Sequence, residues 1–130
     1  MIPKLTDFGQ RRFQTLDDTK IRRRLPYIAP ELLNDSEYPA DTRSDIYGVG
    51  VLLWEISTCK RPFDNEPLDQ LNSDIIYGKR EVVDPNTPSK YSTLYTECWN
   101  SKPESRPCIK HCLTELNAVS HSPFGFRCHI

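Results

Sequence analysis

The stretch SDIYGVGVLLWEI, from Ser44 to Ile56, decides the fold. Its apolar side chains fall on every side of a helical wheel, and a helix that is apolar all round belongs inside a core. We therefore predict a buried central helix over residues 42–57. Thr42 or Ser44 can cap it, and Asp45 lies in its first turn, where the helix dipole favours a negative charge.

Two glycines interrupt this helix, and each costs about 1 kcal/mol relative to alanine. They are Gly48 and Gly50. A glycine lets another backbone approach the helix axis closely, because it carries no Cβ atom. We therefore expect a second segment of main chain to lie against this part of the helix.

Three amphipathic helices are predicted after the central one, so the fold class is mainly α. Residues 68–78 carry one apolar face and end at Gly78, a plausible stop signal. The other two stripes are Tyr91, Leu94, Tyr95, Cys98 and Trp99, and then Ile109, Cys112, Leu113, Leu116 and Val119. Residues 7–30 show no period and are dominated by charge, which predicts a long loop.

Length and composition describe one soluble domain. The chain has 130 residues, 27% charged and 37% apolar, with no apolar run near the ~20 residues that a membrane span needs. No signal peptide is visible at the N-terminus. Five cysteines favour reduced thiols over a disulfide framework. We expect a cytoplasmic protein, with a nuclear location possible, and no membrane partner.

Basic residues concentrate near the N-terminus. Residues 1–31 hold seven Lys or Arg against four Asp or Glu, and the surplus lies mostly in KIRRR, Lys20–Arg24. Such a run can be a localisation signal, a nucleic-acid patch, a site for an acidic partner or a solvated loop. No aromatic residues interleave it and the net charge is -1, so we expect no nucleic-acid partner.

Several short motifs occur in a fixed order. Asp-Phe-Gly at 7–9 is followed by LPYIAPELL at 25–33, the central SDIYGVGVLLWEI, then RPF at 61–63 and CWNSKPESRP at 98–107. In this order and spacing they resemble the C-terminal lobe of a eukaryotic protein kinase domain, from Asp-Phe-Gly onward. The resemblance covers about residues 2–118, and is nearest to tyrosine kinases and tyrosine-kinase-like serine/threonine kinases.

The resemblance implies roles for the first motif. Asp7 would coordinate the magnesium ion that bridges the phosphates of ATP, since a hard cation prefers carboxylate oxygen. Phe8 would pack under the lobe interface, and Gly9 would give the backbone freedom to switch. ATP and Mg²⁺ are thus the cofactors of the complete family domain.

Residues 7–31 correspond by resemblance to the activation segment. Phosphorylation often orders this segment in the family, and Thr15 and Thr19 are candidate acceptors with arginines nearby. The family commonly has a small Gly-Thr pair before the Pro-Tyr step. This chain has Arg23-Arg24-Leu25 there, so a substrate-facing hydroxyl is missing.

Two further roles follow from the resemblance. Glu31 of Ala-Pro-Glu would form a largely buried structural ion pair with Arg106, whose fork binds a carboxylate through two bonds. Asp45 would accept backbone hydrogen bonds from the catalytic loop and brace it.

The catalytic loop itself is not in these 130 residues, and neither are the glycine-rich phosphate loop or the Lys–Glu pair of the small lobe. We therefore expect residues 1–118 to be a truncated kinase domain that is inactive by itself, followed by a loose tail at 119–130. Three interpretations stay open: a protein kinase acting on protein substrates, a non-catalytic protein-binding remnant, and a marginally folded fragment.

The sequence also offers a candidate metal site near the C-terminus. Cys108, His111 and Cys112 lie close on the last predicted helix, but Cys112 belongs to its apolar stripe. Buried thiols are therefore favoured over zinc ligands. All three histidines follow residue 110, so no Ser-His-Asp or Cys-His arrangement can be argued.

Overall fold

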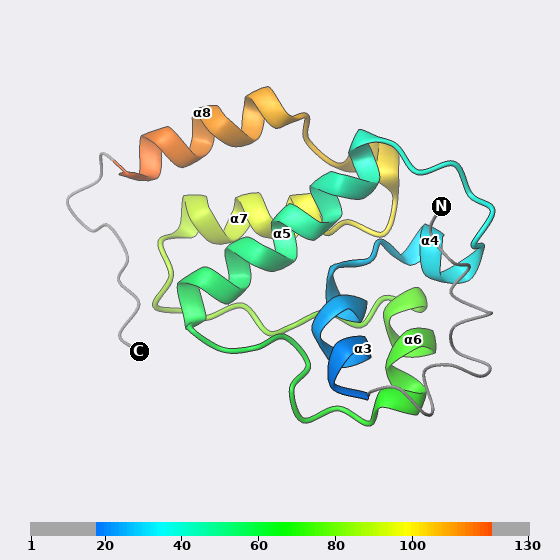
Figure 1. The fold of residues 1–130 in the computed structure, drawn as a ribbon. Coiled ribbons are helices and arrows are strands. Elements are labelled where there is room, and N and C mark those ends of the chain that lie inside the picture. Colours follow the sequence, from blue (N-terminus) through cyan, green and yellow to red (C-terminus); the bar gives the residue numbers. More distant parts are fainter. Residues whose placement is uncertain (1–17, 121–130) are drawn as a thin grey trace.

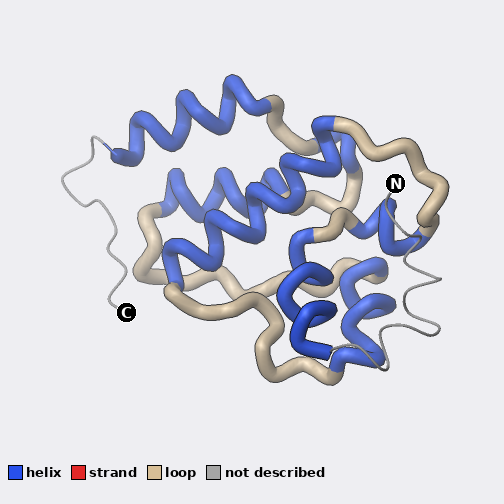
Figure 2. Tube along the Cα trace, in the orientation of Figure 1, coloured by secondary structure: helices blue, strands red, loops and turns tan. Residues whose placement is uncertain are grey.

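A computed structural model describes residues 18–120, and every regular element in that range is helical (Figures 1 and 2). In chain order these elements are α3 Asp18–Arg24, η2 Leu25–Tyr27, α4 Pro30–Asn34, α5 Thr42–Thr58, α6 Leu68–Ile76, α7 Ser89–Cys98, η3 Pro103–Ser105 and α8 Ile109–Ser120. The predicted fold class, a mainly helical kinase C-lobe portion, agrees with this architecture.

The central helix α5 crosses the molecule (Figure 1). It packs on α7 and η2, while α8 packs on the other side of α7 and α4 packs on α6. Helices α3, α4 and α6 thus form one group beside α5, and α7 and α8 form the other.

Helix α5 begins at Thr42 as predicted, but its capping residue is neither of the predicted candidates, Thr42 and Ser44. Asp41 is the N-cap, and its side chain accepts hydrogen bonds from the Arg43 and Ser44 backbone amides. Asp is as good an N-cap as Ser or Thr, so sequence alone does not choose between neighbouring candidates. The Ser44 hydroxyl is used elsewhere, since it donates to Glu31.

The close backbone approach predicted at the glycines of α5 is present. A Cβ atom at Gly50 would lie 2.7 Å from the Cβ of Cys98 and 2.9 Å from the carbonyl oxygen of Tyr95, both in α7. At Gly48 the nearest atom would be the Tyr27 carbonyl oxygen, at 3.1 Å. The backbone of α7 therefore occupies the space that a side chain at position 50 would need.

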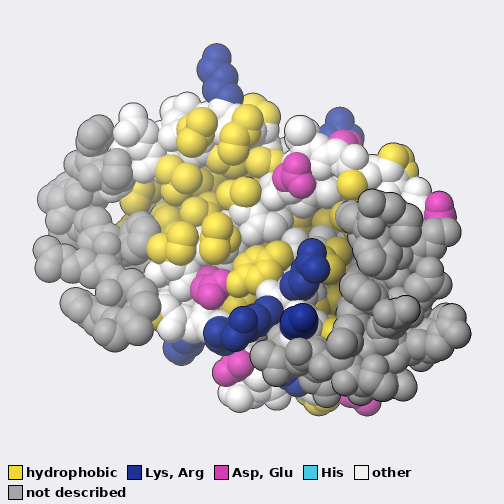
Figure 3. Space-filling model, in the orientation of Figure 1, with side chains coloured by type: hydrophobic (Ala, Val, Ile, Leu, Met, Phe, Trp, Pro, Cys, Tyr) yellow, Lys and Arg dark blue, Asp and Glu magenta, His cyan; other side chains and the backbone are white. Residues whose placement is uncertain are grey.

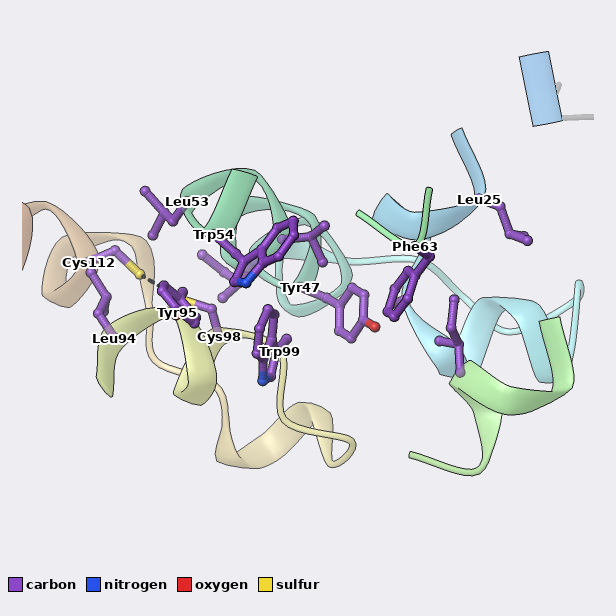
Figure 4. Packing of buried hydrophobic residues seen from close by; sticks show 14 of the residues in the cluster. Leu25, Tyr47, Leu53, Trp54, Phe63, Leu94, Tyr95, Cys98, Trp99 and Cys112 are labelled. Atoms are coloured by element: carbon purple, nitrogen blue, oxygen red, sulfur yellow. Dashed lines mark hydrogen bonds between the residues drawn. The ribbon is translucent and has the colours of Figure 1, made fainter. Parts of the chain in front are cut away.

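The buried face of α5 joins a single core (Figure 4). Polar groups in it are mostly satisfied: Trp54 donates its indole N–H to the Val82 carbonyl at 2.9 Å, and Tyr91 donates its hydroxyl to the Leu53 carbonyl at 2.6 Å. Fully buried large residues of the core include Tyr47, Leu71, Ile75, Tyr91, Leu94, Tyr95, Cys98 and Cys112.

The prediction that α5 is buried on all sides is wrong for one stripe of the helix. Leu52 and Ile56 are 47% and 42% exposed. On α8, Ile109 and Leu113 are 56% and 60% exposed, although they belong to the apolar stripe predicted for this helix. Hydrophobic side chains gather over α5 and α8 on the face in Figure 3. We call these four residues the open face.

The segment predicted as a long loop is helical from Asp18 onward. Arg22, Arg23 and Arg24 occupy the last turn of α3, where positive charge is favourable. Ile21 packs against the core, and Arg22 donates to the Glu66 carbonyl at 2.8 Å. These tertiary contacts stabilise a turn of helix that has no periodic signal in the sequence.

Among the described residues, Cys98, Cys108 and Cys112 are free thiols, which agrees with the expectation of reduced thiols for these three.

Candidate functional site

Part of the predicted site lies outside the described residues. This holds for Asp7, Phe8, Gly9 and Thr15. Thr19 lies within α3, where only its backbone is described. The roles of all five residues stay predictions.

Glu31 and Arg106, by contrast, are brought together. Pro30 begins α4 and places Glu31 in its first turn, where the helix dipole favours a carboxylate. The Arg106 guanidinium binds this carboxylate with two parallel hydrogen bonds, Nη1 to Oε2 and Nη2 to Oε1, each 2.8 Å long. The exposed fractions of the two side chains are 0% for Arg106 and 9% for Glu31.

Further donors and acceptors complete this ion pair. The Ser44 hydroxyl donates to Glu31 Oε2 at 3.1 Å, and Arg106 also donates to the carbonyls of Asn100 and Arg43 at 2.8 and 2.9 Å. The pair therefore connects α4, the start of α5 and the segment after α7. Such a satisfied, bidentate pair can hold backbone segments together but has no group free for chemistry.

The electrostatics of Glu31 follow from these contacts. Burial alone would raise the pKa of its carboxyl, but the hydrogen bonds from Arg106, from backbone and from Ser44 outweigh it and lower the pKa below its ordinary value of 4.5. The carboxylate form is therefore favoured in the folded state.

A second arginine, absent from the sequence predictions, approaches the same region. The guanidinium carbons of Arg80 and Arg106 lie 5.0 and 5.2 Å from the centroid of the Tyr47 ring. We call these three residues the arginine–tyrosine stack. Burial raises the pKa of the Tyr47 hydroxyl to about 12. No motif marks Arg80, so only the folded arrangement identifies it.

Asp45 lies in the first turn of α5 and is exposed. Among the described residues its carboxylate accepts no side-chain or backbone hydrogen bond, and its role in bracing a catalytic loop stays a prediction.

The segment after the basic run makes another contact that the sequence did not suggest. Tyr27 of η2 donates its hydroxyl to the Glu55 carboxylate on α5. Burial, and then this hydrogen bond, raises the pKa of Tyr27. Within the basic run, Lys20, Arg23 and Arg24 are exposed, so their charges face solvent.

No group of His, Cys, Asp or Glu in residues 18–120 has the arrangement of a metal site. The Sγ atoms of Cys98 and Cys112 are 3.7 Å apart and buried, and burial raises the pKa of both thiols. His111 is exposed. The described residues thus offer nothing that fits a magnesium ion, whose predicted ligand is Asp7.

The helices of the described part are also all too short or too polar to cross a membrane.

Comparison with known proteins identifies the class. The family model described as protein tyrosine and serine/threonine kinase matches residues 1–116. The probable serine/threonine-protein kinase roco8 of Dictyostelium discoideum is 33% identical over 123 residues, covering 92% of this chain and 6% of the relative.

Two other relatives give the same result. A probable LIM domain-containing serine/threonine-protein kinase of Dictyostelium discoideum is 34% identical over 96 residues, covering 74% of this chain and 14% of the relative. A serine/threonine-protein kinase/receptor of Acanthamoeba polyphaga mimivirus is 30% identical over 115 residues, covering 88% and 7%. The chain thus spans a small part of the length of these relatives.

The chain belongs to the protein tyrosine and serine/threonine kinase family.

Proposed function

We propose that residues 1–118 supply the C-lobe helices and the activation segment, residues 7–31, of a protein kinase domain. The reaction of such a domain is transfer of the γ-phosphoryl group of ATP to a hydroxyl group of a protein substrate. The single observation that best supports this is the bidentate pair of Glu31 and Arg106, which anchors the end of the segment. The names of the relatives favour serine and threonine as acceptors.

By itself the chain is expected to transfer no phosphoryl group. Phosphoryl transfer depends on positioning and on charge stabilisation. These residues include one expected magnesium ligand, Asp7, but no catalytic base, no second ligand and no phosphate loop. In a complete domain, bound ATP and Mg²⁺ would supply the transferred group and charge neutralisation, and Asp7 would hold the metal.

This proposal is tested by recombining the parts. The purified chain is mixed with a separate piece that carries the phosphate loop, the Lys–Glu pair and the catalytic loop of one of the relatives. Transfer of labelled phosphate to a peptide should appear only in the mixture, and should be lost with Asp7→Asn. Transfer by the chain alone that is lost in Asp7→Asn would contradict its predicted inactivity.

Regulation through Thr15 and Thr19 is part of the same proposal. The exposed charges of Lys20, Arg23 and Arg24 support it, because a phosphate nearby would gain basic partners. Replacing either threonine with alanine should then abolish activation of the recombined domain by an upstream kinase.

A second candidate function is that of a non-catalytic protein-binding module. Tyr77, just after α6, is 89% exposed, and the open face adds apolar surface on α5 and α8. A purified kinase domain of a relative should bind the chain, and Tyr77→Ala should weaken the binding while Asp7→Asn leaves it intact. Tyr38→Ala, at another exposed tyrosine, serves as the matched control. The opposite pattern would favour a catalytic role.

We place the protein in the cytoplasm or the nucleus. The three free thiols support this location. Fractionation of cells that express the full-length gene product tests it.

A further inference from the structure

Arg80 connects three segments through one half-buried guanidinium. Its Nε donates to the carbonyl of Trp99 at 2.9 Å, at the end of α7. Its Nη1 donates to the carbonyls of Ile75 and Lys79 at 3.0 and 2.7 Å, at the end of α6. The remaining nitrogen, Nη2, donates to the Ser101 hydroxyl oxygen at 3.0 Å.

The charge of Arg80 has no carboxylate beside it. In the part of the chain that the structure describes, the ion pairs are Lys79 with Glu66 and Arg106 with Glu31. Arg106 is therefore neutralised, whereas Arg80 has only neutral acceptors and the Tyr47 ring. The arginine–tyrosine stack thus holds two cations, of which only Arg106 is paired with a carboxylate, that of Glu31. The surplus positive charge favours an additional negative charge nearby.

Ser101 is the part of this arrangement that solvent can reach. It lies in the segment between α7 and η3 and is exposed, and so is its neighbour Lys102. A turn fixes the segment, because Asn100 Oδ1 accepts the Lys102 backbone amide at 2.9 Å. The two residues before Ser101 are also held, because the carbonyls of Trp99 and Asn100 accept hydrogen bonds from Arg80 and Arg106. The hydroxyl is thus held beside a guanidinium but remains open to another enzyme.

We propose that Ser101 is a phosphorylation site whose phosphate binds Arg80. A protein kinase acting in trans would supply ATP. The bond between the γ-phosphorus and its oxygen bridge to the β-phosphate breaks, a bond from Ser101 Oγ to that phosphorus forms, the hydroxyl proton passes to the base of that kinase, and ADP leaves. The phosphate carries about -1.5 to -2 charges and accepts charge-assisted hydrogen bonds from a guanidinium.

The phosphate would tighten contacts that are already present. Arg80 joins the ends of α6 and α7, so a stronger bond to position 101 would hold both helix ends more firmly. Lys102, one residue away, adds a second positive charge. This inference does not depend on whether the chain itself transfers phosphoryl groups.

Ser105 provides a matched control. It is exposed and lies in the same connection, at the end of η3. Among the described residues its hydroxyl makes no hydrogen bond, and its backbone amide bonds to the Lys102 carbonyl. A phosphate there has the same chemistry without a positioned guanidinium.

The test places phosphoserine at position 101 or at position 105 of the full 130-residue chain during synthesis. The ³¹P signal of each form is followed against pH, since the second ionisation of a phosphoserine lies near pH 6. Beside Arg80 the midpoint at position 101 should be about 0.5 pH lower than at position 105. Equal midpoints in native buffer would overturn the proposal.

Two further measurements test whether the effect depends on the folded contact with Arg80. The difference between the two titration midpoints should vanish in urea, and also in Arg80→Gln. The phosphate at position 101 should also lower the unfolding equilibrium constant about fivefold, an effect of the size of an exposed ion pair, and the phosphate at position 105 should not. Mapping of phosphate on the protein from its own cells should find Ser101 modified. Phosphate on other serines with Ser101 unmodified would count against the site.

Discussion

Glu31 accepts three side-chain hydrogen bonds, two from Arg106 and one from Ser44. Because Arg106 is fully buried, a neutral partner would leave its charge without compensation. Glu31→Gln should therefore lower the free energy of unfolding by about 3–5 kcal/mol. Denaturant unfolding measures this. The control is Glu66→Gln, which breaks the partly exposed pair with Lys79 and should cost much less, because solvent screens an exposed pair. Similar losses for the two variants would contradict the burial argument.

The same residue predicts a dependence on acid. The pKa of Glu31 is lower in the folded chain than its ordinary value of 4.5, so the folded state binds fewer protons than the unfolded state. The stabilisation is complete above pH 4.5 and is lost as the pH falls through the lowered pKa. The denaturant concentration at the midpoint of unfolding should therefore decrease as the pH is lowered from about 5 to about 3. In Glu31→Gln this midpoint should change less with pH. An unchanged pH dependence would mean that Glu31 is not its source.

Tyr47 makes the stability of the fold depend on pH in the opposite direction, with a loss of stability at high pH. Its hydroxyl is buried and has no hydrogen-bond partner in residues 18–120, and burial raises its pKa from 10.0 to about 12. The unfolded chain therefore loses this proton first, and the folded state is destabilised between pH 10 and pH 12.

Tyr47→Phe keeps the ring that both guanidinium groups contact and removes the hydroxyl. Near neutral pH it should be as stable as the original chain or more stable, because an unsatisfied polar group is removed. At about pH 11 its advantage should grow by about 1 kcal/mol. Denaturant titrations at two pH values measure the difference. A large loss of stability at neutral pH would mean that the hydroxyl has a partner after all.

At the scale of elements, the contact of α5 with α7 depends on one glycine. Gly50→Ala places a Cβ atom 2.7–3.2 Å from Cys98, Tyr95 and Trp99, mostly against backbone, so the helices must separate. We expect a loss of about 1–3 kcal/mol. Gly48→Ala has a single close neighbour at 3.1 Å and gains about 1 kcal/mol of helix propensity, so its net effect should be small. Thermal unfolding ranks the two variants, and the reverse order would contradict the packing described.

Helices α6 and α7 could be predicted from the sequence because each has an apolar period, and α5 because its apolar side chains follow a capping signal and an acidic first turn. Helix α3 could not, since it is stabilised by packing of Ile21 on the core and by the hydrogen bond from Arg22 to the carbonyl of Glu66, 44 positions away. For α8 the period predicted the helix but not its burial. Only the side with Cys112 and Val119 meets α7, and Ile109 and Leu113 remain outside.

Only part of the candidate site could be predicted, because its contacts join residues that are far apart in the sequence. The pairing of Glu31 with Arg106 came from resemblance to a family, since nothing in their local sequence links them. Arg80 and Tyr47 are 33 positions apart and belong to no shared motif, so their contact could only be found in the folded chain. The bond between Tyr27 and Glu55 is of the same kind.

At the scale of the whole molecule, the open face should govern solution behaviour. Large exposed apolar surfaces promote association. We expect the chain to self-associate as its concentration rises, as measured by sedimentation velocity, and Leu52→Gln with Leu113→Gln to suppress this. Val82→Gln, at an exposed apolar residue outside the open face, is the control. A monomer at all concentrations would contradict the prediction.

The distance in sequence between Glu31 and Arg106 has a consequence for synthesis. The two residues are 75 positions apart. At about 5–20 residues per second, a ribosome needs roughly 4–15 seconds to make that interval. During this time the Ala-Pro-Glu segment has left the ribosome without its arginine, while α5, α6 and α7 are still being added. The Ala-Pro-Glu segment is therefore among the last parts of the nascent chain to be fixed in place, and among the longest exposed to chaperones.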